Sequence, residues 1–130
     1  MDLITISQEK GSKFKTEIRN HSFSLDMSVK DGGNDLAPSP AEYLVSTLGA
    51  CIGMTINTYC QTHGYDSNDI GLSATYVLND KPKMIKNITI DIELPESFPS
   101  DRHKAILNSV KSCVIYNSLS KDIEIDIEIE

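Results

Sequence analysis

Apolar and polar residues alternate along the first third of the chain, as they do in half-buried strands. The residues on the apolar faces of two neighbouring segments are Phe14, Thr16 and Ile18, followed by Phe23, Leu25 and Met27. Asn20-His21 between the segments is typical of a turn, so the pattern predicts a hairpin. A further short strand is expected at Leu3–Ile6, with Glu9–Ser12 as its turn.

The second half of the chain repeats this alternation twice. The apolar positions of a second hairpin are Leu72, Ala74, Tyr76 and Leu78, followed by Ile88, Ile90, Ile92 and Leu94. Asn79–Pro82 predicts the connection between these two strands. From Ile123 to Ile129, isoleucine alternates with Asp or Glu at every step, and this period of two predicts a closing strand.

A long helix is expected between the two hairpins. Ser39 suits the N-cap, Pro40 suits the first helical position, and Glu42 completes an S-x-x-E capping box. Gly64 is a natural residue to follow the helix end near His63. The predicted helix is apolar on several sides, so a second helix or a second subunit should cover what one sheet face leaves exposed.

A second helix is expected from about Ser100, a plausible cap, to Cys113, which it carries at its C-terminal end. Strands in hairpins, interrupted by two main helices without strict β-α-β alternation, indicate an α+β fold built on antiparallel sheets. The length of 130 residues fits one domain, so a single domain spanning 1–130 is expected.

Charge and hydropathy exclude several classes of protein. The net charge of −7 argues against a nucleic-acid-binding surface, because such surfaces depend on clustered Lys and Arg. No apolar run approaches the roughly 18 residues of a membrane span, and the N-terminus lacks the pattern of a signal peptide. A cytoplasmic location without membrane association is therefore expected.

The three cysteines and three histidines indicate reduced thiols without a metal or cofactor. They are Cys51, Cys60 and Cys113, and His21, His63 and His103. An odd number of cysteines in a chain without an export signal favours free thiols over a disulfide framework. No cysteine pair has C-x-x-C spacing and the histidines stand apart, so no metal site is expected.

Cys51 is the first candidate for chemistry because it lies within Gly49–Gly53, whose two glycines each cost the helix about 1 kcal/mol. The glycines either allow close packing or leave space beside the sulfur for a substrate. Packing alone, with Cys51 as a small core residue, is an equally good interpretation. Burial in mid-helix raises the pKa of a thiol, so a reactive Cys51 would need a cation from another segment.

Arg19 is the candidate for that cation, because its guanidinium stays charged and can also bind a peroxide oxygen. A solvated place on the outer face of the first hairpin explains Arg19 at least as well. Glu42 could orient the guanidinium, although the capping box already gives it a structural task. Nine residues separate Glu42 from Cys51, which is about 13 Å along a helix and on its opposite side.

Cys113 is the better partner thiol for Cys51. Cys60 also lies nine residues from Cys51, so the two cannot reach the Cα separation of about 4.4–6.8 Å that a disulfide needs. Cys113 comes from a different element and is free to approach. Cys60 is interpreted as a bystander.

At this point the sequence resembles the OsmC/Ohr family, named for osmotically induced protein C and organic hydroperoxide resistance protein. The resemblance rests on Gly32–Leu44, which runs into Leu48–Cys51, and it resumes at Cys113–Leu119. It implies that Cys51 attacks a hydroperoxide to form a sulfenic acid, which Cys113 converts to an intramolecular disulfide. A dithiol such as a lipoylated protein would then return the electrons.

The resemblance also implies an intertwined homodimer with the long Cys51 helices at its centre, which would bring Arg19 or Glu42 near a cysteine. Val114 stands where many relatives have proline, and the catalytic glutamate of the hydroperoxide-resistance branch falls here on Ala41. The chain is thus more similar to the OsmC-like branch. Two alternatives to a thiol peroxidase are a stress-related ligand-binding or redox-sensing protein with little turnover, and a structural dimer whose cysteines only pack.

Overall fold

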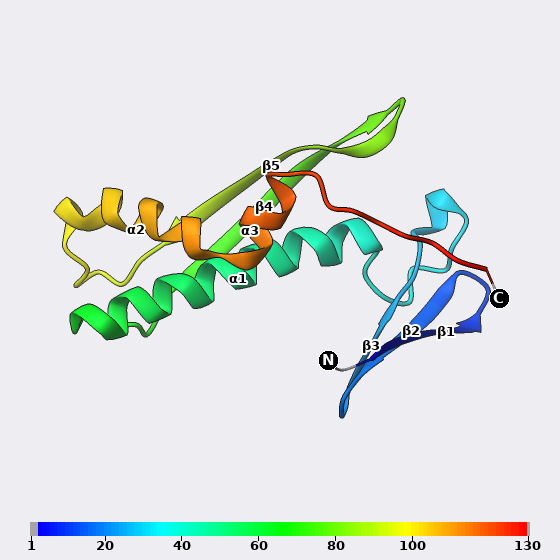
Figure 1. Ribbon diagram of the computed structural model, residues 1–130, viewed down its shortest axis with the longest axis horizontal. Coiled ribbons are helices and arrows are strands. Elements are labelled where there is room, and N and C mark those ends of the chain that lie inside the picture. Colours follow the sequence, from blue (N-terminus) through cyan, green and yellow to red (C-terminus); the bar gives the residue numbers. More distant parts are fainter. Residues whose placement is uncertain (1–2, 130) are drawn as a thin grey trace. The chain divides into compact units, whose positions relative to one another are not determined.

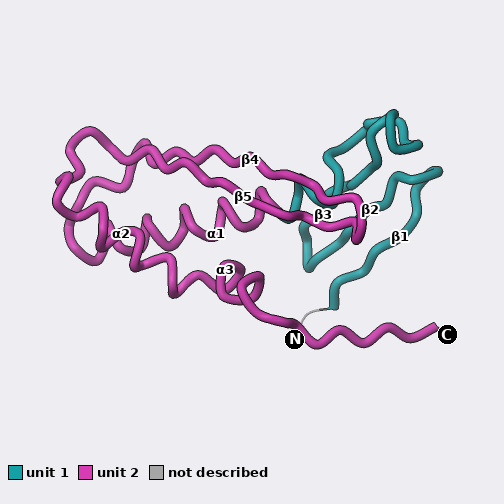
Figure 2. The backbone as a smooth tube through the Cα atoms, turned by 90° about the horizontal axis from the view of Figure 1, so that it is seen from above, with its two compact units in different colours: residues 1–44 teal, residues 45–130 magenta. Residues whose placement is uncertain are grey.

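The computed structural model describes residues 3–129. The chain divides into two compact units, Met1–Leu44 and Val45–Glu130, coloured separately in Figure 2. Both hairpins expected from the sequence are present, and the architecture is α+β with antiparallel sheets. The prediction of the fold class is confirmed, while a single domain spanning the chain stays a prediction.

The first unit holds a three-stranded antiparallel sheet in the order β1-β2-β3. Its strands are β1 (Ile4–Lys10), β2 (Lys13–Ile18) and β3 (His21–Leu25). β1 is longer than the alternation of apolar residues indicates. The turn between β2 and β3 lies one residue earlier than expected, at Arg19 and Asn20, and Arg19 has a φ of 53°.

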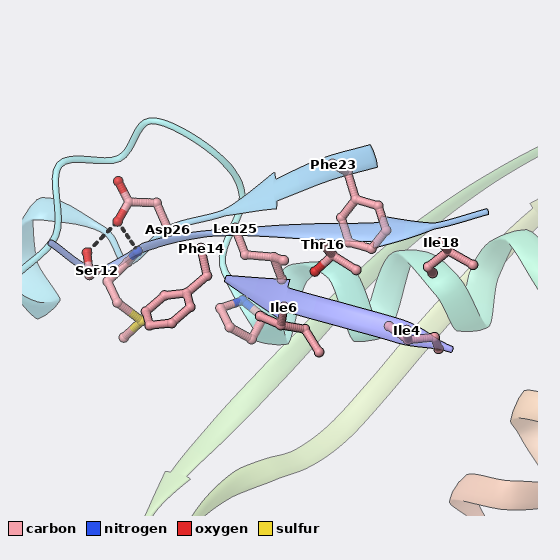
Figure 3. A pocket seen from close by; sticks show the side chains of 11 residues that line it. Ile4, Ile6, Ser12, Phe14, Thr16, Ile18, Phe23, Leu25 and Asp26 are labelled. Carbon is pink, nitrogen blue, oxygen red and sulfur yellow. Dashed lines mark hydrogen bonds between the residues drawn. The ribbon is translucent and has the colours of Figure 1, made fainter. Parts of the chain in front are cut away.

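One face of this sheet is apolar and hollowed, with a cavity of about 490 Å³. Figure 3 shows its side chains, which include Ile4, Ile6, Phe14, Ile18, Phe23 and Leu25. Ile4, Ile6, Phe14 and Phe23 all remain substantially exposed. Burying such side chains is favourable, so this face is suited to contact with further apolar surface.

Asp26 holds the loop that follows β3 in place. It is a buried acidic residue, only 2% exposed. Its carboxylate accepts hydrogen bonds from the Ser12 hydroxyl and from the N–H groups of Met27 and Leu36. The hydrogen bond from Ser12 is the main reason that the pKa of Asp26 is lowered. Gly33 lies against the same turn, where an added Cβ would be 2.1 Å from the carbonyl oxygen of Met27.

Helix α1 (Pro40–His63) begins and ends where the sequence predicts. The Glu42 N–H donates to Ser39 Oγ at 3.2 Å, and the Ser39 N–H donates to Glu42 Oε1 at 2.9 Å. This reciprocal pair is the expected capping box. Gly64 follows the helix with a φ of 72°, which favours glycine at that position.

In the second unit, α1 runs beside the hairpin of β4 (Gly71–Asp80) and β5 (Lys83–Glu93), as Figure 1 shows. Leu72 pairs with Ile92, Ala74 with Ile90 and Tyr76 with Ile88, which confirms the predicted apolar face. A bulge follows, because Val77 pairs with Asn87 but Leu78 with Ile85.

The expected helix from Ser100 to Cys113 is not continuous. It consists of a 3₁₀ turn (Ser100–Arg102), α2 (His103–Ser109) and a second 3₁₀ turn (Val110–Ser112). A further helix, α3 (Val114–Leu119), follows directly and is absent from the elements predicted by periodicity. The core of the unit joins α1 to α2 and the residues around them through Leu48, Ile52, Ile56, Cys60, Phe98, Ile106, Val110 and Cys113.

The predicted closing strand is wrong for this structure, because residues 122–129 form no strand. The isoleucines at 123, 125, 127 and 129 are 56–99% exposed. A strand needs an adjacent strand to satisfy its N–H and C=O groups, and the described part of the chain does not pair with this stretch. Residues 123–129 therefore have the alternating pattern of a strand, but within the described residues they have no partner strand.

Candidate functional site

Cys51 lies in the middle of α1, where its side chain is half-buried at the edge of the core. The helix continues regularly through this point, and Thr55 Oγ1 donates to the Cys51 carbonyl oxygen at 2.9 Å. Gly49, two residues earlier, has open space where a side chain would begin. Gly53 is tighter, because an added Cβ would be 3.1 Å from Leu72 Cδ1.

Cys113 is not at the C-terminal end of a continuous helix, as expected, but between a 3₁₀ turn and α3. Its extended backbone (φ −77°, ψ 119°) makes it the N-cap of α3, and its Sγ accepts a hydrogen bond from the Tyr116 N–H at 3.4 Å. The side chain is only 1% exposed. The sharp change of direction at Cys113 is what turns its sulfur toward α1.

The two sulfur atoms are in contact: Cys113 Sγ donates a hydrogen bond to Cys51 Sγ at 2.8 Å. Both cysteines are free thiols. The structure thus brings together the two cysteines that the sequence singled out. Their mutual approach comes from two elements separated by 62 positions in the chain.

The surroundings of the two thiols drive their pKa values in opposite directions. Partial burial raises the pKa of Cys51, but hydrogen bonds outweigh burial and leave that pKa lowered. The largest of these comes from the Cys113 thiol, followed by the N–H groups of Ile115 and Val114. Burial raises the pKa of Cys113, and its hydrogen bond to Cys51 raises it further. Cys51 is therefore the thiol that more readily becomes a thiolate.

In this structure hydrogen bonds, and not a cation, oppose the effect of burial on the pKa of Cys51, and the need for a cation stays a prediction. The stabilisation is supplied by another thiol and by backbone N–H groups at the start of α3. Periodicity gave no signal for this helix, because its cap is a cysteine and not one of the usual Ser, Thr, Asp or Asn residues. The only indication in the sequence was the stretch Cys113–Leu119 that carries the family resemblance.

Arg19 and Glu42, the other two candidates, both lie in the first unit. Arg19 is exposed in the turn between β2 and β3, and Glu42 forms the capping box of α1. A role for either beside Cys51 stays a prediction.

Cys60 is fully buried in the core of the second unit. Burial, and to a smaller extent the nearby Asp66 carboxylate, raises the pKa of Cys60. A protonated thiol in the core is a poor nucleophile, so these surroundings agree with the interpretation of Cys60 as a bystander.

Within residues 3–129, no three side chains of His, Cys, Asp or Glu gather as metal ligands. The helices of the same region include none with the length and apolar character to cross a bilayer.

A family of known proteins matches most of the chain. The family model of OsmC-like proteins matches residues 32–128, a range that includes both cysteines of the pair. The search among curated proteins found no match. An α+β fold with two facing thiols defines a class of small thiol proteins, and within it this chain belongs to the OsmC-like protein family.

Solved structures share the fold over nearly the whole chain. An osmotic stress induced and detoxification response protein of Psychrobacter arcticus has a TM-score of 0.85 at 18% identity, covering 91% of this chain and 88% of that one. An OsmC-like protein of Mycoplasma pneumoniae has a TM-score of 0.80 at 20% identity, covering 92% and 87%. The organic hydroperoxide resistance protein OhrB of Bacillus subtilis has a TM-score of 0.62 at 12% identity, covering 93% and 90%.

Proposed function

We propose that this protein is a thiol-dependent peroxidase that reduces organic hydroperoxides or hydrogen peroxide through Cys51 and Cys113. The observation that carries the proposal is the sulfur pair, 2.8 Å apart, with the pKa of Cys51 lowered and that of Cys113 raised. Membership of the OsmC-like family and the fold shared with hydroperoxide resistance proteins support a stress-related redox role.

The first step uses the difference between the two thiols. The Cys51 thiolate attacks one oxygen of the peroxide and the O–O bond breaks. The leaving alkoxide, or hydroxide from hydrogen peroxide, takes a proton to become an alcohol or water. Cys51 is oxidised to a sulfenic acid and the peroxide is reduced. Hydrogen bonds from the Cys113 thiol and from the N–H groups of Ile115 and Val114 lower the pKa of the attacking sulfur and so favour its thiolate.

In the second step, Cys113 attacks the sulfenic sulfur. The S–S bond forms, the S–O bond breaks, and the hydroxyl leaves as water after taking a proton. A dithiol then reduces the disulfide by thiol exchange and is itself oxidised to a disulfide, which restores both cysteines. A lipoylated protein is the dithiol suggested by the family resemblance.

The proposal includes a homodimer, because each unit carries apolar side chains that the unit itself does not cover. In the first unit they lie on the hollowed face of the β1-β2-β3 sheet, and in the second they are the isoleucines of residues 123–129. In this dimer, the terminal segment of one copy joins an edge of the other copy's sheet, which satisfies backbone N–H and C=O groups of both. Arg19 and Glu42 are proposed to act on Cys51 in this dimer. The proposed location of the protein is the cytoplasm.

The proposal is tested with purified protein, cumene hydroperoxide and reduced dihydrolipoamide. We expect catalytic loss of peroxide and, without the dithiol, a Cys51–Cys113 disulfide detected by mass spectrometry of peptides. Cys51→Ser should reduce turnover by at least about 100-fold, since it removes the nucleophile. Cys60→Ser is the matched control and should retain full turnover.

Two results would count against a peroxidase. If Cys51 does not react with a small excess of hydroperoxide, the first step of the proposed mechanism is excluded. Formation of the disulfide without sustained turnover, whichever dithiol is supplied, would instead favour a redox-sensing protein of the same family.

A further inference from the structure

The backbone changes direction at Cys113, between the 3₁₀ turn of Val110–Ser112 and the start of α3. In a continuous α-helix, each C=O group accepts a hydrogen bond from the N–H group four residues later. The Lys111 carbonyl would then be paired with the Ile115 N–H. The break at Cys113 separates such pairs, so carbonyls before it and N–H groups after it need other partners.

The N–H groups released by the break are used at the reactive sulfur. Ile115 and Val114 both donate their N–H groups to Cys51. Cys113 Sγ, at the break itself, donates to the same sulfur at 2.8 Å. Stabilisation of a Cys51 thiolate therefore depends on α3 starting anew at Cys113 and not continuing the preceding helix.

The carbonyl oxygens before the break have substitute donors. The Val110 carbonyl accepts from the Cys113 N–H at 2.9 Å, and the Lys111 carbonyl accepts from Asn117 Nδ2 at 2.8 Å. The backbone N–H of Asn117 also donates to the Cys113 carbonyl at 3.0 Å. One residue thus bonds to both sides of the break, and its side chain takes the place that the Ile115 N–H would have in a continuous helix.

We propose that Asn117 is a positioning residue for the thiol pair, because its side-chain amide keeps the start of α3 directed at Cys51. Without the amide, the Lys111 carbonyl and the Ile115 N–H are free to pair with each other, and the reactive sulfur loses a donor. The same rearrangement turns the Cys113 thiol away from it. The effect on the thiolate needs no peroxide chemistry, whereas the effect on disulfide formation rests on the proposed function.

The effect on the thiolate is tested with Asn117→Ala in a Cys60→Ala background. Asn117 is exposed, so its replacement leaves no cavity in the core. Alkylation of Cys51 by iodoacetamide is followed over a range of pH by mass spectrometry of its peptide, since only the thiolate reacts rapidly. We expect the midpoint to move to higher pH. Below both midpoints, alkylation should be about fivefold slower, the factor for one hydrogen bond of ordinary net strength.

Two further variants separate positioning from a general loss of structure. Asn79→Ala is the matched control, because Asn79 Nδ2 donates to the Pro82 carbonyl oxygen at 3.1 Å in the turn between β4 and β5. This variant loses the same kind of bond elsewhere in the unit and should keep the midpoint of the parent protein. Asn117→Gln retains an amide donor, so its midpoint should lie closer to that of the parent than the midpoint of Asn117→Ala.

The effect on disulfide formation is measured with one equivalent of cumene hydroperoxide. In Asn117→Ala, the Cys51–Cys113 disulfide should form about fivefold more slowly than in the parent, and more of the sulfenic acid should be trapped by dimedone. If no variant forms a sulfenic acid, the proposed peroxidase fails, while a shifted alkylation midpoint would still support the positioning role of Asn117.

The positioning role is overturned if Asn117→Ala and Asn79→Ala have the same alkylation midpoint. A lower melting temperature of Asn117→Ala with an unchanged midpoint would overturn it as well, because Asn117 would then only stabilise the turn. Equal midpoints of Asn117→Ala and Asn117→Gln would also overturn it, since the amide would not be the group that matters.

Discussion

Cys51 and Cys113 carry the same functional group, but the protein surrounds the two sulfurs differently. Cys113 donates a hydrogen bond to Cys51 and accepts a hydrogen bond from the Tyr116 N–H. One side chain therefore both caps α3 and favours the thiolate of its neighbour. Cys51 receives hydrogen bonds from Cys113, Ile115 and Val114. The order of reaction in the proposed mechanism follows from this difference between the residues.

Removing the Cys113 thiol, which donates a hydrogen bond to Cys51, should raise the pKa of Cys51. In a Cys60→Ala background, Cys113→Ala leaves only the backbone N–H groups to oppose burial, so the thiolate should form at higher pH. The pH profile of alkylation by iodoacetamide measures this, because only the thiolate reacts rapidly. The midpoint should move upward in Cys113→Ala, with slower alkylation at neutral pH.

Cys113→Ser is the matched control, because its hydroxyl can still donate a hydrogen bond. Its midpoint should stay closer to that of the parent protein than the midpoint of Cys113→Ala. Equal midpoints in all three proteins would show that Cys113 does not stabilise the thiolate.

At the scale of elements, two short segments determine where the important groups lie. The turn from Val110 through Cys113 into α3 directs one sulfur and two N–H groups toward α1. The loop after β3 is held by Asp26, and it includes Gly33 because the backbone of Met27 occupies the space of a side chain. Both segments are irregular, and both overlap stretches that carry the family resemblance.

Gly33→Ala should destabilise the first unit by about 1–3 kcal/mol, the usual range for forcing extra atoms into a filled space. The neighbouring atoms are backbone, so they cannot move aside as a flexible side chain would. Thermal unfolding measures the loss. Gly71→Ala is the control, since an added Cβ there meets only ordinary contacts at 3.9 Å, and it should unfold like the parent protein. Equal stability of both variants would contradict a filled space at Gly33.

Regular elements could be predicted from the sequence, because their signals are local. The capping box of Ser39 and Glu42 and the paired apolar faces of β4 and β5 are set by residues a few positions apart. The approach of Cys113 to Cys51 was predicted only in outline. Its cause is a change of backbone direction between two short helices, for which apolar periodicity provides no signal.

At residues 123–129 the sequence predicted a regular element that the structure does not form. Alternation at 123–129 is a property of the segment alone, whereas a strand also requires a neighbour for its backbone. The sequence therefore indicated a tendency to form a strand, and the partner that would complete it was not available in the described chain.

At the scale of the whole molecule, each unit has apolar surface that it does not cover by itself, and this surface links the strand tendency of residues 123–129 to the proposed dimer. The sheet of the first unit presents exposed Ile4, Ile6 and Phe14 beside its free edge strand β1. The closing segment presents isoleucines of the same character. Neither surface is needed to complete the core of the second unit, so assembly and folding of that unit can be tested separately.

Ile125→Asp should weaken the proposed homodimer at least about tenfold. Burying one isoleucine is worth about 1.5–3 kcal/mol, and each 1.4 kcal/mol corresponds to a tenfold change in affinity. Sedimentation velocity over a range of protein concentrations measures the shift toward monomer. The far-UV circular dichroism should change little, because Ile125 is already 74% exposed in the single chain.

Asp126→Asn is the matched control on the acidic side of the segment, and it should not weaken the dimer. Equal dissociation constants for Ile125→Asp and the parent protein would exclude the closing segment from the interface.

The acidic side of the closing segment has a consequence for solubility. A seven-residue stretch of alternating isoleucine has the β-propensity of an aggregation-prone sequence, and an exposed one is a hazard. Glu124, Asp126 and Glu128 occupy every second position, so two such segments stacked in register would set carboxylates directly opposite carboxylates. Repulsion between these like charges acts as a gatekeeper, because it disfavours fibril-like stacking of copies while leaving the isoleucines free to join a different strand.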